Sequence, residues 1–66
     1  MALDAMREAR RRLGLTQAEL AKDVGVTRQT ISQVESGDYN PTLHLCVRIA
    51  RRLGTDLNTL FWGEGH

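Results

Sequence analysis

The sequence predicts a compact all-α domain of five short helices. Its apolar residues recur at helical spacings of three and four, and no stretch alternates with a period of two for long enough to indicate a strand. Glycines and capping residues divide this pattern into five segments joined by short turns. The 66 residues are enough for one small domain and no more.

Start and stop signals set the bounds of these helices. Thr16 and Glu19 form a capping box, and Gly14, Gly37 and Gly54 stand at helix ends. The expected helices span about residues 3–13, 17–23, 27–36 and 42–53, with a short fifth helix that begins at Asp56. Residues 1–62 are therefore expected to form the domain, and residues 63–66 a flexible tail.

The apolar spacing also predicts the core. On the first helix, Arg10 shares its stripe with apolar residues. The residues expected to face inward are Leu3, Met6, Leu13, Leu20, Ala21, Val24, Ile31, Val34, Leu43, Cys46, Ile49, Ala50 and Leu53.

Composition excludes several classes of function. One cysteine cannot form an internal disulfide, and together with two histidines it gives no zinc-site spacing, so we expect no metal and no cofactor. No apolar run reaches the roughly 20 residues of a membrane span. No nucleophile–base arrangement is recognisable, and no small-molecule ligand is evident, so an enzyme is not expected. The net charge of +1 argues neither for nor against nucleic acid.

Residues 17–34 carry the most informative pattern. Two short helices joined by a glycine-containing turn are typical of the helix-turn-helix, expected here at about residues 17–35. Ala21 falls where two such helices come closest, and Gly25 supplies the positive φ that the turn needs. Ile31 fills the angle between the helices, and Leu20, Val24, Val26 and Val34 complete the wedge.

An ordinary corner between two helices would share this apolar spacing, but the outward face of the second helix favours DNA. Arg28, Gln29, Ser32 and Gln33 lie there at spacings of three and four. Arginine pairs with guanine and glutamine with adenine in the major groove. A merely solvated face more often carries glutamate and lysine, and this helix has no lysine.

The run GLTQAELAKDVGVTRQTISQVESGDYNPT resembles the lambdoid phage repressor and Cro-type helix-turn-helix domains, the XRE family. The resemblance covers about residues 3–62 and combines the motifs G-L-T-Q, A-x-x-x-G-V-T, I-S-x-x-E-x-G and N-P-T. It implies the lambda-repressor-like DNA-binding fold, whose third helix docks in the major groove of operator DNA, usually as a dimer.

The resemblance also implies roles for single residues. Gln17 matches a glutamine that contacts a phosphate, and Arg10 and Glu35 match a salt bridge, which we expect to be partly buried. Tyr39 and Asn40 lie in a loop that approaches phosphates, although Asp38 and Tyr39 bring it little positive charge and thus indicate modest affinity per monomer. The positions that match base-reading and adjacent backbone-reading residues are Thr27, Arg28, Gln29, Ser32 and Gln33.

The end of the domain is expected to supply a dimer contact. Its apolar centre is predicted at Leu57, Leu60, Phe61 and Trp62, because tryptophan is enriched among interface hot spots and the contact must lie away from the third helix.

Taken together, these features predict a cytoplasmic, nucleoid-associated transcriptional regulator. We expect it to bind double-stranded DNA at a pseudo-palindromic operator as a homodimer and to act as a repressor. One alternative is an antitoxin whose main partner is a toxin and whose DNA binding serves autoregulation. Another is a helical scaffold with no DNA role, in which Arg28, Gln29 and Gln33 would vary freely.

Overall fold

The computed structural model describes residues 4–62 and confirms the all-α fold with five helical segments. Leu3 and the predicted tail, residues 63–66, lie outside the described residues. The segments are α1 (Asp4–Arg12), α2 (Gln17–Val24), α3 (Arg28–Ser36), α4 (Leu43–Leu53) and a π-helical turn, η1 (Asn58–Trp62).

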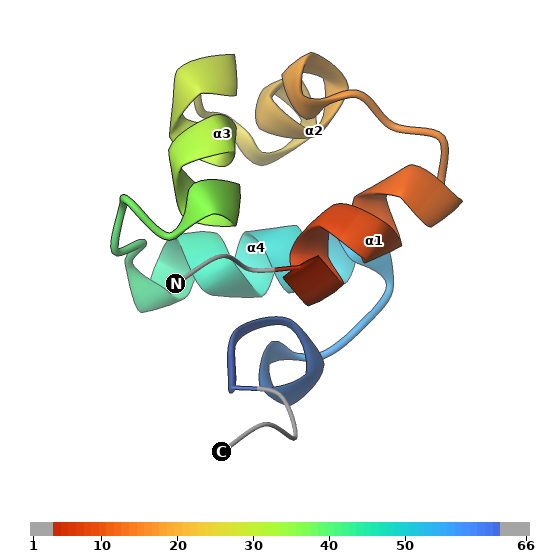
Figure 1. Ribbon diagram of the computed structural model, residues 1–66, viewed down its shortest axis with the longest axis vertical. Helices are drawn as coiled ribbons and strands as arrows, with labels where there is room; N and C mark the ends of the chain where they lie inside the picture. Colours follow the sequence, from red (N-terminus) through yellow and green to blue (C-terminus); the bar gives the residue numbers. More distant parts are fainter. Residues whose placement is uncertain (1–3, 63–66) are drawn as a thin grey trace.

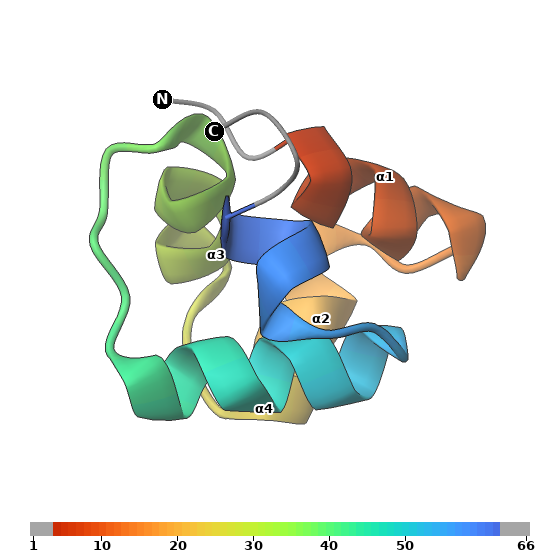
Figure 2. The ribbon, with the colours of Figure 1, turned by 90° about the horizontal axis from the view of Figure 1, so that it is seen from below.

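The helices surround a single small core. α2 packs against α3 and α4, while α1 packs against α3 and η1 (Figure 1). The view from below shows α4 along one edge of the molecule, with the chain returning through η1 toward α1 (Figure 2). None of the helices in residues 4–62 is long and apolar enough to cross a membrane.

Local sequence signals start and end the three central helices in the same way. Thr16, Thr27 and Thr42 each accept a hydrogen bond from the backbone N–H three residues later, and α2 carries the full predicted capping box with Glu19. These caps satisfy backbone donors that have no partner within the helix. Each helix therefore begins where its threonine predicts.

The tight turn between α2 and α3 depends on Gly25. This residue has φ +81°, a left-handed conformation that costs other residues free energy because of their Cβ atom. A Cβ atom there would also lie 3.3 Å from Nη2 of Arg48, which extends from α4. The turn thus fixes the angle at which α3 leaves α2.

The buried residues agree with most of the predicted core. Ile31 and Val34 of α3 pack with the inner face of α2, and burial raises the pKa of the Cys46 thiol, which is consistent with its packing as a small apolar side chain. The core is Met6, Leu20, Ala21, Val24, Ile31, Val34, Leu45, Cys46, Ile49, Ala50, Leu53 and Leu60.

Two predicted core positions are wrong. Leu13 is 49% exposed because α1 ends at Arg12 and the chain turns away before Leu13 can continue the buried stripe. Leu43 is 64% exposed because Leu45, two residues later, takes the core position in the first turns of α4. The buried stripe of α4 therefore runs through Leu45, Ile49 and Leu53, and Leu43 lies outside it.

Candidate nucleic-acid interface

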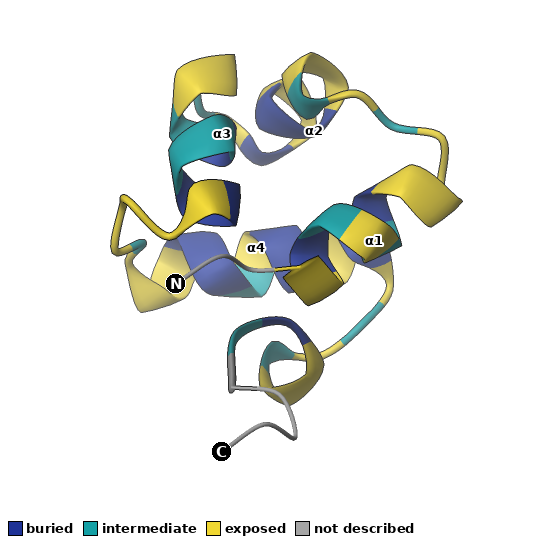
Figure 3. Cartoon of the chain, in the orientation of Figure 1, coloured by how far each residue is buried: buried dark blue, intermediate teal, exposed yellow. Residues whose placement is uncertain are grey.

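The outward face of α3 is polar and accessible. Arg28 and Gln29 are exposed, and Ser32 and Gln33 are half-buried, while Ile31 and Val34 hold the opposite face on the core. Figure 3 shows the exposed start of α3 at one end of the molecule. Four of the five side chains predicted to read bases are thus presented together by α3.

Thr27 has a structural task at the start of α3. Its Oγ1 accepts a hydrogen bond from the backbone N–H of Thr30 at 3.2 Å and lies 3.0 Å from the Thr30 hydroxyl. This geometry caps α3 and orders its first turn. The cap places Arg28 and Gln29 in that turn.

A buried ion pair joins α1 to the end of α3. Arg10 Nε donates to Oε2 of Glu35 at 2.7 Å, and Arg10 Nη2 donates to Oε1 at 3.2 Å. Glu35 is 0% exposed and Arg10 is 8% exposed, so the pair is more deeply buried than the sequence led us to expect. Arg10 Nη1 also donates to the Leu15 carbonyl at 2.8 Å, which ties the turn after α1 to the same group.

Two further side chains complete the surroundings of Glu35. Gln17 Nε2 donates to Oε1 at 3.0 Å, and Arg7 Nε lies 3.6 Å from the same oxygen. Burial by itself would raise the pKa of Glu35, but the hydrogen bonds from Arg10 and Gln17 and the charges of Arg10 and Arg7 outweigh it. The pKa of Glu35 is therefore below its ordinary value, and the group is a carboxylate at neutral pH.

Gln17 connects this buried group to the exposed face of α3. Its Oε1 accepts a hydrogen bond from Nη1 of Arg28 at 3.5 Å. The family resemblance predicts only a phosphate contact for Gln17, and nothing in the sequence points to the contact between Arg7 and Glu35. No local pattern reveals these contacts, because Gln17 and Glu35 are 18 residues apart.

The loop after α3 leaves its side chains in solvent. Tyr39 and Asn40 are exposed, as is Asp38, whose Oδ2 accepts a hydrogen bond from the Ser36 hydroxyl. The backbone N–H groups of Asp38 and Tyr39 both donate to the Gln33 carbonyl, at 2.9 and 3.2 Å. These two backbone amides therefore cap the C-terminus of α3 and are not free to contact a phosphate. The side chains of the loop remain available for such a contact.

Comparison with known proteins decides the family. The family model described as helix-turn-helix matches residues 6–60. The chain belongs to this helix-turn-helix family. Membership implies DNA binding, in agreement with the exposed polar face of α3.

Relatives of this helix-turn-helix protein carry matching names. It is 61% identical over 51 residues to an HTH-type transcriptional regulator of Methanothermobacter thermautotrophicus, covering 77% of this chain and 74% of that protein. It is 50% identical over 66 residues to one of Archaeoglobus fulgidus, covering 89% and 94%. The crystal structure of the restriction-modification controller protein C.AhdI from Aeromonas hydrophila superimposes with a TM-score of 0.79, at 33% identity and with 86% of each chain covered.

The helix-turn-helix protein does not present all of its predicted dimer residues at the surface. Leu60 is 3% exposed and belongs to the core, so its side chain offers nothing to a partner in this conformation. The reason is that η1 packs against α1 and turns Leu60 inward. Leu57 and Phe61 are half-buried, and the Trp62 side chain lies outside the described residues.

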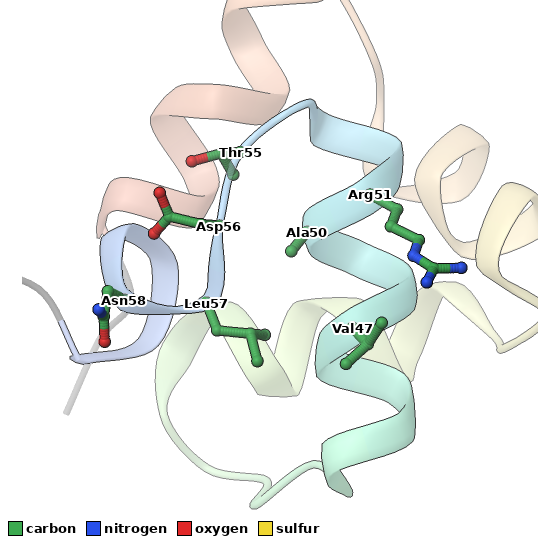
Figure 4. Close-up of a pocket in the computed structure, with 7 residues that line it drawn as sticks. All are labelled: Val47, Ala50, Arg51, Thr55, Asp56, Leu57 and Asn58. Carbon is green, nitrogen blue, oxygen red and sulfur yellow. The ribbon is translucent and has the colours of Figure 1, made fainter.

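An open pocket lies between α4 and the start of η1. Its volume is about 500 Å³, and Val47 and Ala50 of α4 face Leu57 across it (Figure 4). Its lining is completed by Arg51, Thr55, Asp56 and Asn58, and the Arg51 side chain extends away from Leu57. Leu43, one turn before Val47 on α4, is exposed beside it. Within residues 4–62, no cluster of three or more histidine, cysteine or acidic side chains is arranged to hold a metal.

Removal of one partner of the ion pair should destabilise the fold strongly. Arg10→Met leaves Glu35 buried without its main donor, and such a loss costs about 3–5 kcal/mol. Arg11→Met, on the same helix but exposed, should change the free energy of unfolding by less than about 0.5 kcal/mol. Urea unfolding of both variants measures the difference, and equal midpoints would contradict this role of the pair.

The lowered pKa of Glu35 predicts a loss of stability in acid. Because its folded-state pKa lies below the unfolded value of about 4.3, the carboxylate contributes fully above that pH. The contribution is lost as the pH falls through the folded-state pKa. Thermal unfolding of the parent should therefore show a steeper fall in midpoint below about pH 4 than that of Glu35→Gln. Parallel curves for the two proteins would rule out this linkage.

Proposed function

We propose that this helix-turn-helix protein is a sequence-specific repressor that reads a pseudo-palindromic operator with α3 and binds it as a homodimer. The observation that carries the proposal is the outward face of α3, where Arg28 and Gln29 are exposed in the first turn. The apolar face of the same helix packs against α2, and this packing holds α3 in position while these side chains project into solvent.

The side chains of this face have the chemistry of base reading. An arginine can donate two hydrogen bonds to O6 and N7 of guanine, and a glutamine can pair with N6 and N7 of adenine. Ser32 and Gln33, one turn further along α3, extend the readable surface. In this proposal Thr27, at the start of the helix, reads a base or the adjacent backbone, and Gln17, Tyr39 and Asn40 contact phosphates. The net charge of +1 limits non-specific attraction, which gives the base contacts more weight.

Substitutions on α3 should reduce binding to a preferred site selected from random duplex DNA. Arg28→Ala and Gln29→Ala should each cost roughly 1–3 kcal/mol of binding free energy and relax the preference at one base pair in each half-site. Arg12→Ala removes an exposed charge from α1 and controls for net charge. Titrations monitored by fluorescence anisotropy test this. Parent-like binding by both α3 variants would disprove the assignment of α3.

The proposed homodimer uses the exposed face of α4 together with the end of the domain. The half-buried Val47 and Leu57 line the pocket, and the exposed Leu43 lies one helical turn before Val47; Phe61 and Trp62 would add to this contact. In a two-fold contact the exposed Leu43 of each copy can enter the pocket of the other. The contact must also leave two α3 helices free to reach successive major grooves, about 34 Å apart.

A single charge in this surface should prevent dimer formation. Leu43→Asp should be monomeric in analytical ultracentrifugation and should bind a palindromic site more weakly than the parent. Leu13→Asp is the matched control, because Leu13 is also an exposed leucine but lies at the end of α1. Because the apolar surface of this contact is small, we expect the dimer to be weak in the absence of DNA and to be stabilised when both copies bind one site. Parent-like dimers of Leu43→Asp, or a parent that stays monomeric on a full palindrome, would refute this interface.

Repression is the expected consequence of occupying a site that overlaps a promoter. A reporter gene with the selected site placed across its promoter should be expressed less when the protein is present. The antitoxin alternative is not favoured, because the relatives are named as transcriptional regulators.

A further inference from the structure

We propose that Glu35 is a positioning residue for Arg28 and acts through the side-chain amide of Gln17. The buried carboxylate would then help to set the specificity of DNA reading as well as the fold. This inference rests on the proposed function, namely that Arg28 reads a base. It assigns Gln17 a second role beside the proposed phosphate contact.

The carboxylate of Glu35 is held in place by its hydrogen-bond donors. It is fully buried, and both of its oxygens accept hydrogen bonds from Arg10, which is itself held by the Leu15 carbonyl. No buried side-chain nitrogen or oxygen in the described part of the chain lacks a hydrogen-bond partner. Glu35 is therefore a fixed acceptor at the point where α1, the start of α2 and the end of α3 meet.

The Glu35 carboxylate sets the orientation of the Gln17 side-chain amide. An ionised carboxylate can only accept hydrogen bonds, so the NH₂ group of Gln17 must point toward Glu35, as the 3.0 Å contact shows. The carbonyl oxygen of the amide is then directed away from the buried group. Without Glu35, either orientation of the amide would be open.

This orientation of the Gln17 amide in turn presents a hydrogen-bond acceptor to Arg28. The outward Oε1 of Gln17 lies 3.5 Å from Nη1 of Arg28 and accepts its hydrogen bond. A reversed amide would present N–H groups to the guanidinium, which is itself only a donor. Glu35 thus holds an acceptor beside an otherwise exposed arginine and restricts its orientations before DNA arrives.

Such preorganisation leaves the groups needed for binding free. The guanidinium has five N–H donors, so one bond to Gln17 leaves others for a guanine edge, and the second amide hydrogen of Gln17 remains for a phosphate. Ordering a long side chain in advance lowers the entropy lost on binding. We expect this ordering of Arg28 to increase the difference in affinity between the correct base and other bases, because only the correct base can accept hydrogen bonds from the guanidinium in its fixed orientation.

The test is a double-mutant cycle on base discrimination. The readout is the discrimination ratio, the Kd for the site in which the base pair assigned to Arg28 is replaced divided by the Kd for the selected site. Gln17→Met keeps the length of the side chain but removes the amide, and it should lower this ratio by roughly threefold to tenfold. In an Arg28→Ala background the same substitution should leave the ratio unchanged. Lys22→Met, an exposed change on α2, serves as the control.

Glu35→Gln gives the second arm, with folding checked by circular dichroism. Its neutral amide can accept or donate, so the orientation of Gln17 is no longer fixed and the ratio should fall as in Gln17→Met. A purely structural role would weaken binding to both sites equally and leave the ratio at the parent value, which would overturn the inference. If Arg28→Ala itself leaves the ratio unchanged, the proposed function fails instead.

Discussion

The interaction on which the arrangement of the helices depends is the buried carboxylate of Glu35 with its donors. Arg10 from α1 and Gln17 from α2 both bond to this residue of α3. Replacing such a pair with apolar residues is often neutral for stability, whereas leaving one partner alone is costly. We therefore interpret the Arg10–Glu35 ion pair mainly as an interaction that favours one relative arrangement of α1, α2 and α3. A small core of aliphatic side chains offers few other constraints of that kind.

The start and end of each helix follow from local rules that need no partner. The three threonine caps and the left-handed glycines fix where α2, α3 and α4 begin and end. For that reason their bounds and most of the core could be predicted from the sequence. The exposed face of α3 could be predicted as well, because the apolar Ile31 and Val34 determine which side of that helix is buried.

Features that depend on contacts between distant residues could not be predicted in this way. Helical spacing predicts Leu43 in the core, and the expected dimer contact at the end of the domain puts Leu60 at the surface. The phase of α4 leaves Leu43 exposed, and the packing of η1 against α1 buries Leu60. The contacts of Gln17 with Glu35 and Arg28 join residues 18 and 11 positions apart, so no pattern reports them. The depth of the Arg10–Glu35 pair likewise depends on how three helices close over it.

We propose that α3 reads the DNA in its major groove and that the hydrogen bonds of Glu35 with Arg10 and Gln17 remain intact in the complex. Nuclear magnetic resonance titration of the ¹⁵N-labelled protein with its selected duplex tests it most directly. If α3 reads the DNA, the largest chemical-shift changes should fall on residues 27–33 and on the side chains of Gln17 and Arg28, while the Arg10 Nε–H signal should keep its hydrogen-bonded position. Shifts concentrated on α1 or η1, with α3 unchanged, would contradict it.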